Sequence, residues 1–219
     1  MKKYIFLALL LTGSLAVQAQ EKGGMSLEAG AAYYHPFFGG NTKNNFNYGF
    51  SLLVSKRFRN VKVSAGIDYA TKKYYYEVNP TGFNPLTKRE YDMQYLNFPF
   101  LVNITVARLS EKAELGLLTG LVLNKVAGYK IISTYANHPV SEDDLEIPAS
   151  MGLTFRLGAA FSLPLGNRFR LNLTPFGDIK LVMNGNQDSS GDPYAGSYRN
   201  LPDNRFTLGI QAGMEYLFK

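Results

Sequence analysis

The sequence predicts an all-β protein, an eight-stranded antiparallel up-and-down transmembrane β-barrel with short periplasmic turns and long external loops. Apolar residues recur at every second position through most of the chain, which is the period of a strand with two different faces. After the N-terminal leader, no segment offers the roughly 20 continuous apolar residues that a membrane-spanning helix needs. Tyrosine and phenylalanine make the chain 14% aromatic, whereas charged residues contribute only 18%. That balance is unusual for an exported protein in water.

The N-terminus has the pattern of a cleavable secretory signal. Two lysines open it, an apolar stretch follows to Val17, and small residues precede a cleavage point after Ala19. The apolar stretch is too short to serve comfortably as a membrane anchor. Cysteine is absent, which excludes a disulfide framework, a thiolate metal site and an acylated lipoprotein anchor. The expected domains are therefore a signal peptide over residues 1–19 and a barrel over residues 20–219.

Eight runs carry the alternation and are the expected strands. They cover residues 25–34, 46–54, 61–69, 91–106, 113–126, 151–163, 169–183 and 205–218. The connections alternate in length, with short turns at 57–60, 107–112 and 164–168 and long segments at 35–44, 79–90, 129–149 and 184–204. Short turns at one end and long loops at the other are typical of an outer-membrane barrel, and an even strand count places both termini at the periplasmic end.

The two faces of the strands distinguish a membrane barrel from a soluble barrel with an apolar interior. The polar face is rich in glycine, which suits the narrow lumen of an eight-stranded barrel. The apolar face carries no charge in the middle of any expected strand, where a lysine or arginine facing lipid costs about 2–4 kcal/mol. Aromatic girdles are expected at both ends, from Tyr33, Tyr69, Tyr75 and Tyr129 externally and from Phe58, Phe169, Tyr216 and Phe218 on the periplasmic side.

The remaining strand charges fall on the interior register, and acidic and basic residues are equal in number. They are Glu28, Lys62, Asp68, Glu114, Arg156, Arg170, Asp178, Lys180, Arg205 and Glu215. A buried charge needs a partner, and a balanced set supplies partners. We interpret the set as a plug of ion pairs that closes the barrel, with an ion-conducting lining as the alternative. Arg156 is expected to pair with Glu114 on the preceding strand or with Asp178 on the following one.

Tyr95-Leu96-Asn97-Phe98-Pro99-Phe100-Leu101 resembles the most recognisable motif of the PorT-like outer-membrane β-barrel family. Glycine-marked strands such as Gly66 to Tyr69 and Gly116 to Gly120 are similar to those of the family, so the resemblance covers the mature chain. Asn97 and Phe98 depart from the motif, in which an acidic residue and an isoleucine are common. The resemblance implies an outer-membrane location and allows an accessory role in protein secretion through the envelope.

The last expected strand resembles the signal that the barrel-assembly machinery reads. That signal combines a polar residue, a glycine and hydrophobic residues at the terminus, here Gln211, Gly213, Tyr216 and Phe218. An ordinary alternating strand explains the apolar positions but not the glycine together with the aromatic terminus. Two prolines, Pro99 and Pro175, interrupt expected strands. Because proline removes a ladder donor, we expect a local bulge or a weakened ladder at each.

Little in the sequence points to catalysis, so we expect no enzyme, no cofactor and no metal site. The two histidines, His35 and His138, fall in expected external loops, and neither has a serine two residues later. Histidine is the usual general base, so its scarcity counts against catalysis. Acidic residues gather in the third and fourth external loops without calcium-loop spacing, and a charge run is usually a solvated face. They are Glu142, Asp143, Asp144, Glu146, Asp188 and Asp192.

The predicted function is that of a non-enzymatic integral outer-membrane barrel of a Gram-negative envelope, serving surface or envelope interaction or secretion, with a small-solute pore as the alternative. Expected partners are outer-membrane lipid and lipopolysaccharide, the barrel-assembly machinery, and an envelope protein that the external loops contact. A monomer is expected. The net charge of +6 includes no lysine or arginine block suited to nucleic acid, which is therefore not an expected partner.

Overall fold

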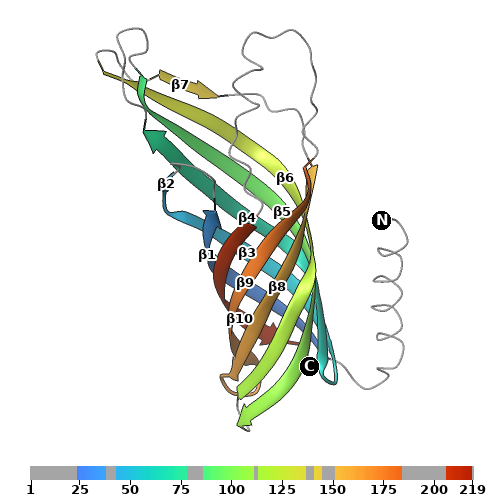
Figure 1. Cartoon of the computed structure of the whole chain (residues 1–219). Helices are drawn as coiled ribbons and strands as arrows, with labels where there is room; N and C mark the ends of the chain where they lie inside the picture. The colour runs from blue at the N-terminus through green and yellow to red at the C-terminus, as the bar shows by residue number, and fades with distance from the viewer. Residues whose placement is uncertain are drawn as a thin grey trace.

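Alternation of apolar and polar residues produces a sheet of ten strands, in which eight long strands form a closed ring (Figure 1). The computed structural model describes residues 24–37, 43–77, 86–110, 113–136, 141–144, 151–183 and 206–218, without the side chains of 110, 141–144, 182 and 183. The expected signal peptide, His138, Glu146, Asp188, Asp192 and Arg205 lie outside this part of the chain. Within it, no helix is long and apolar enough to cross a membrane.

The eight long strands are β1 (Met25–Phe37), β3 (Asn47–Phe58), β4 (Val61–Glu77), β5 (Leu86–Ser110), β6 (Ala113–Tyr135), β8 (Met151–Pro164), β9 (Phe169–Met183) and β10 (Phe206–Leu217). Two short strands, β2 (Lys43–Asn44) and β7 (Ser141–Asp144), pair with β4 and β6. Each long strand pairs antiparallel with the next one along the chain, and β1 closes the ring against β10. The predicted fold class, an eight-stranded up-and-down barrel, is confirmed.

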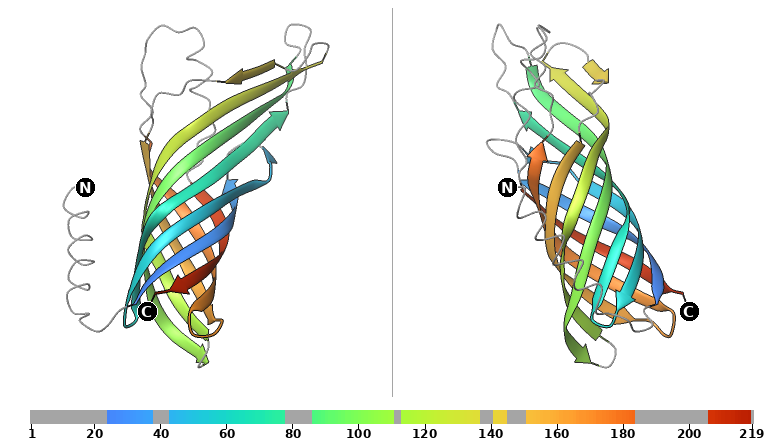
Figure 2. Two further views of the ribbon diagram at one scale, coloured as in Figure 1. Left: turned by 180° about the vertical axis from the view of Figure 1, so that it is seen from behind. Right: turned by 90° about the vertical axis from the view of Figure 1, so that its right-hand side faces the viewer.

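At the external end of the ring, some strands extend further than others (Figure 2). β4, β5 and β6 continue beyond the other strands as a three-stranded external extension, which comprises residues 72–77, 86–94 and 128–135. The extension occupies parts of two segments that were expected to be loops, 79–90 and 129–149. β2 and β7 pair with the outer edges of the extension, which would otherwise be open to pairing with other chains.

Tyr129 corrects one detail of the predicted aromatic girdle. A β-bulge in β6 leaves Ala127 opposite the step between Gln94 and Tyr95. The extra residue reverses the two faces of β6 above it, because the side-chain period of a strand is two. Tyr129 is consequently buried on the inner face instead of facing outward.

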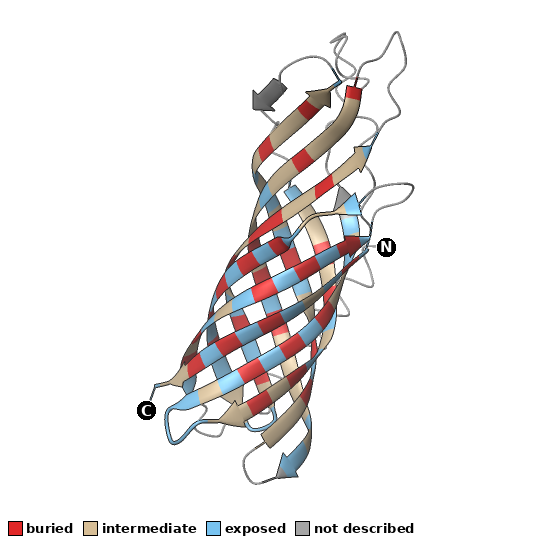
Figure 3. Ribbon diagram, turned by 90° about the vertical axis from the view of Figure 1, so that its left-hand side faces the viewer, coloured by how far each residue is buried: buried red, intermediate tan, exposed pale blue. Residues whose placement is uncertain are grey.

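The exterior of the ring is apolar and its lumen is mixed. Buried and exposed residues alternate along the strands, as Figure 3 shows. On β3, Phe50, Leu52 and Val54 are 59%, 51% and 48% exposed, whereas Ser51 and Leu53 between them are buried. This is the arrangement of a barrel with hydrocarbon outside, and it confirms the predicted outward face of β3.

The middle of the lumen holds a leucine layer rather than only small residues. Leu53, Leu101 and Leu118 pack together there, and each is at most 7% exposed. The layer fits because glycines leave space beside two of the leucines. A β-carbon on Gly66 or Gly120 would lie 2.9 Å from Cδ2 of Leu53 or Leu101 respectively. The expectation that large residues lie outside is therefore incomplete, because glycines on adjacent strands make room for leucine inside.

Both prolines weaken a ladder without shifting its register. Between β4 and β5 the pairing stops after Ala65–Phe100 and resumes at Asp68–Asn97, which leaves Pro99 in the gap. Between β8 and β9 it stops at Phe161–Leu173 and resumes at Gly158–Phe176, which leaves Pro175 in the gap. The weakened ladder was one of the two expected outcomes, and the missing N–H of proline is its cause.

Replacement of Gly120 by alanine should destabilise the barrel. Alanine normally stabilises a strand relative to glycine, but here its β-carbon would meet Leu101 and the carbonyl oxygen of Phe100. We expect the free energy of unfolding to fall by about 1–3 kcal/mol, measured by urea titration in lipid vesicles. The matched control is Gly177→Ala, whose β-carbon would lie 3.3 Å from the edge of the Phe206 ring. Equal stability of Gly120→Ala and the wild type would contradict this account.

Candidate functional site

The external half of the lumen contains a buried ion-pair cluster centred on Arg156. Its Nε donates to Asp178 Oδ1 over 2.7 Å and its Nη2 to Asp178 Oδ2 over 2.9 Å, which makes a bidentate pair between β8 and β9. Its Nη1 lies 3.6 Å from Asp68 Oδ2 on β4, across the lumen. The guanidinium also stacks over the Phe176 ring at 4.0 Å. Arg156 is 2% exposed, so these contacts replace its water.

Asp68 is the least satisfied member of this cluster. Its side chain is 2% exposed, and neither carboxylate oxygen has a hydrogen-bond partner in the described part of the chain. Ser51 and Asn97 flank Asp68 in the register of the neighbouring strands. The Ser51 hydroxyl accepts a hydrogen bond of 2.9 Å from Gln211, and the Asn97 side-chain oxygen accepts one of 2.9 Å from Asn124. Neither residue uses its donor group in these two bonds. The carboxylate therefore depends mainly on the charge of Arg156.

Lys72 is a lumen residue that was not expected. Its Nζ donates to Thr207 Oγ1 over 3.4 Å and lies 5.2 Å from the centre of the Tyr95 ring. The sequence could have predicted this inward position, because Lys72 continues the even-numbered inner register that begins at Lys62. Lys180 faces the same region, opposite Thr154.

The periplasmic half of the lumen contains a second buried cluster. Lys62 Nζ lies 3.0 Å from Glu28 Oε2 and 3.4 Å from Glu215 Oε2. Asn172 Nδ2 donates to the same two oxygens over 2.8 Å and 3.1 Å, and Ser26 donates to Glu215 over 2.6 Å. One lysine thus bridges two carboxylates, and neutral donors satisfy the remaining acceptor sites.

Glu114 lies at the periplasmic end of the lumen and does not contact Arg156. Its Oε2 accepts from Arg57 Nη1 over 2.6 Å and from Arg170 Nη1 over 3.2 Å. The three residues come from β3, β6 and β9, so the contacts cross the lumen. Of the two partners considered for Arg156, the structure selects Asp178. Arg57 was expected in a turn, although it ends the odd-numbered inner register of β3.

Three residues of the expected assembly signal lie on the two faces of β10, and the fourth, Phe218, directly follows its end. Gln211 and Gly213 face the lumen, where Gln211 Nε2 donates to Ser51 Oγ. Tyr216 and Phe218 lie outside, with ring centres 5.3 Å apart, and Arg168 Nη1 donates to the Tyr216 hydroxyl over 3.3 Å. Two residues of the signal thus pack inside the barrel while the aromatic pair faces the bilayer side.

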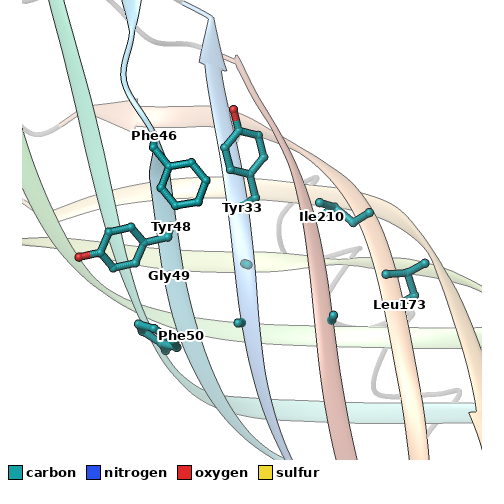
Figure 4. A pocket seen from close by; sticks show the side chains of 10 residues that line it. Tyr33, Phe46, Tyr48, Gly49, Phe50, Leu173 and Ile210 are labelled. Carbon is teal, nitrogen blue, oxygen red and sulfur yellow. The ribbon is translucent and has the colours of Figure 1, made fainter.

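The outer surface carries one described groove, close to the external end of β1 (Figure 4). Phe46, Tyr48 and Phe50 form one wall, and Leu173 and Ile210 stand on the other side. The groove has a volume of about 460 Å³, and its remaining lining is Ala31, Ala32, Tyr33, Gly49 and Ala212. These groups offer apolar contacts and no charged partner, which suits a hydrocarbon surface.

The external extension has an aromatic inner face. Tyr91 stacks on Tyr74 with ring centres 4.9 Å apart and on Tyr129 at 6.2 Å. Burial raises the pKa of Tyr91 to about 12, with the neighbouring Tyr76 as a second cause, which moves its ionisation further above physiological pH. On the outer face, Lys73 Nζ lies 2.6 Å from Asp92 Oδ2. The extension thus combines a tyrosine core with a charged surface.

Groups that could perform chemistry are scarce among the described residues. His35 lies within β1 and not in a loop, because that strand continues to Phe37, and its ring packs against Phe37 with centres 5.1 Å apart. No group of three or more His, Cys, Asp or Glu residues in the described part of the chain could hold a metal ion. The lumen arrangement holds opposite charges together, which suits closure of the barrel.

No family model and no curated protein matches the chain, but solved structures do. A major outer membrane protein from Thermus thermophilus is 17% identical with a TM-score of 0.55, over 90% of this chain and 100% of that chain. Ail of Yersinia pestis, solved with the heparin analogue sucrose octasulfate, is 14% identical (TM-score 0.48), over 90% and 100%. Neisserial surface protein A is 12% identical (0.46), over 89% and 97%. At these identities, the likeness to the Thermus protein shows the fold of an outer-membrane β-barrel.

Replacement of Arg156 by methionine should strongly destabilise the folded barrel. The change keeps most of the side-chain volume but leaves Asp178 and Asp68 buried without their cation. We expect a loss of about 3–5 kcal/mol in the free energy of unfolding, measured by urea titration in lipid vesicles. The matched control Arg168→Met, at an exposed turn, should cost less than about 1 kcal/mol. Similar losses in the two variants would show that the buried cluster contributes little.

Proposed function

We propose that the protein is a non-enzymatic barrel of the outer membrane that holds its lumen closed and binds an envelope partner through the external extension. The observation that carries this proposal is the extension itself. Three strands continue beyond the ring and stay paired apart from β-bulges at Ala127 and near Thr87, so they present a sheet surface where most barrels of this size have loops.

The outer-membrane location draws support from the chain's own surface. The exterior is apolar over the height of the ring, and aromatic residues such as Phe169 and Phe218 remain exposed at its periplasmic end. We infer that residues 1–19 direct export and are removed, and that the C-terminal residues from Gln211 to Phe218 recruit the barrel-assembly machinery. The likeness of residues 95–101 to the PorT-like family supports a secretion-accessory role within this general function.

A closed lumen is supported by the order of its layers. The leucine layer lies between the Arg156 cluster and the Lys62 cluster, so an ion that crossed would leave one polar region, pass apolar side chains and enter another. Most of the described charges at both sides are in ion pairs, which leaves little of the unpaired lining that an ion channel uses. These contacts favour a scaffold over a small-solute pore.

The outer face of the extension supplies the chemistry for a partner. Its charges form cross-strand pairs, such as Lys73 with Asp92, and Lys43 on β2 lies 2.9 Å from Glu77. The Lys43–Glu77 pair is exposed and Lys73 is partly exposed, so these lysines cost little to rearrange and can exchange their partner for a group on a protein or a lipopolysaccharide phosphate. β2 and β7 protect the edges from unspecific strand addition, which leaves the faces for recognition.

The closed lumen predicts the electrical behaviour of the purified protein. In planar bilayers the wild type should give no stable conductance steps, because the leucine layer and the ion pairs fill the narrow lumen. Reproducible conductance whose ion selectivity changes on Glu114→Gln would establish the pore instead.

The external extension should be required for partner binding and dispensable for folding. A variant that lacks residues 73–92, with Lys72 joined to Met93 by an Asn-Gly turn, shortens β4 and β5 at a paired position. We expect it to insert in the membrane and to lose the partners that cross-linking recovers from intact envelopes. The control exchanges the pair as Lys73→Asp with Asp92→Lys and retains the extension. Recovery of the same partners with the deletion would remove the basis of the proposal.

A further inference from the structure

The periplasmic end of the barrel is strongly basic. Among the described residues at this end, the basic ones are Lys56, Arg57, Arg59, Lys62, Arg108, Arg168 and Arg170, and the acidic ones are Glu28, Glu114 and Glu215. All three acids face the lumen, and each already accepts from a basic partner. The described charges on the turns and the outer rim are therefore all positive, which attracts anions from the periplasmic side.

The entrance on this side is built around one shared carboxylate. We name Arg57, Glu114 and Arg170 the periplasmic mouth. Their side chains are 18–20% exposed, so they are within reach of solvent, unlike the clusters deeper in the lumen. Two guanidinium groups hold a single oxygen of Glu114, which leaves the mouth with an excess positive charge.

Both arginines of the mouth also have unused hydrogen-bond donors. The Nε atoms of Arg57 and Arg170 are buried and have no acceptor among the described residues. A buried donor without an acceptor indicates a group that the chain itself does not supply. The planar guanidinium presents Nε and one terminal nitrogen as a fork, which matches the two oxygens of a carboxylate.

We propose that the periplasmic mouth binds an acidic segment of a periplasmic protein, whose carboxylates contact Arg57 and Arg170. Arg59 and Arg168 on the surrounding turns and Arg108 near the end of β5 attract the rest of the segment. Arg57 and Arg170 point into the lumen, where the barrel wall separates them from phospholipid headgroups. A flexible acidic chain can enter the mouth from below. The exposed arginines mainly accelerate encounter, whereas the mouth determines how long the segment stays bound.

This inference rests on the orientation in the proposed function but uses the opposite face of the protein. Because the chain contains no cysteine, single substitutions report the orientation cleanly. In intact cells a membrane-impermeant thiol reagent should label Glu77→Cys and not Arg59→Cys. Labelling of Arg59→Cys would overturn the orientation and the proposed function. Correct labelling without peptide binding would overturn only the acidic-segment proposal.

Binding is tested with a fluorescent deca-glutamate peptide and the full-length barrel in detergent, followed by fluorescence anisotropy. The wild type should bind it, a deca-glutamine peptide should not bind, and added salt should weaken binding. Arg57→Gln with Arg170→Gln should weaken affinity by about tenfold or more, because charged hydrogen bonds are lost. The control pair Lys73→Gln with Lys125→Gln, at the external end, should bind like the wild type. Equal losses in both double variants would overturn the proposal.

Glu114→Gln separates a binding role from a structural one. It removes the carboxylate that occupies both guanidiniums, so the peptide should bind several-fold more tightly than it binds to the wild type. A purely structural ion pair predicts unchanged or weaker binding, and that result would overturn the proposal. Inorganic phosphate and vesicles that contain phosphatidylglycerol serve as competitors. If the vesicles displace the fluorescent peptide at a lower concentration of negative charge than unlabelled glutamate peptide does, the ligand is lipid. That result would also contradict the proposal.

Discussion

The closure of β1 against β10 is the constraint on which the rest of the structure depends. A closed ring satisfies the backbone hydrogen bonds of its strands without leaving an edge, but eight strands leave a lumen that their own side chains must fill. The side chains inside must therefore be complementary in size, so that a leucine on one strand lies against a glycine on the next. Gly66 and Gly120 show this directly, because the space beside each is occupied by a leucine.

The charges inside follow from the same confinement. Hydrocarbon excludes them from the outer face, so each charged residue within the ring must turn inward and find a partner there. The result is two polar clusters, around Arg156 and Lys62, with an apolar layer between them. Bidentate geometry and neutral donors such as Asn172 reduce the cost of burying these groups. The burial of Asp68 is the least well compensated, because its carboxylate contacts a single guanidinium at 3.6 Å.

The two ends of the barrel present different chemistry to different compartments. At the external end, β4, β5 and β6 extend the sheet with a stacked tyrosine core and balanced surface charges. At the periplasmic end the turns are short and their described charges are positive, with two arginines on a single glutamate. In the proposed function, a closed barrel that joins two such surfaces links partners on both sides of a membrane, and no solute passes through it.

The sequence by itself determined the strands, their inner and outer faces and the closed topology, because a period of two is a local property and short turns fix which strands are neighbours. It also placed most of the interior charges. Only the tertiary structure decided the pairs: Arg156 contacts Asp178 and not Glu114, because strand tilt sets the height of each residue in the ring. Arg57 and Lys72 were missed because their strands extend further than the clear alternation. Tyr129 turned inward because one unpaired residue, Ala127, shifts every later side chain to the other face.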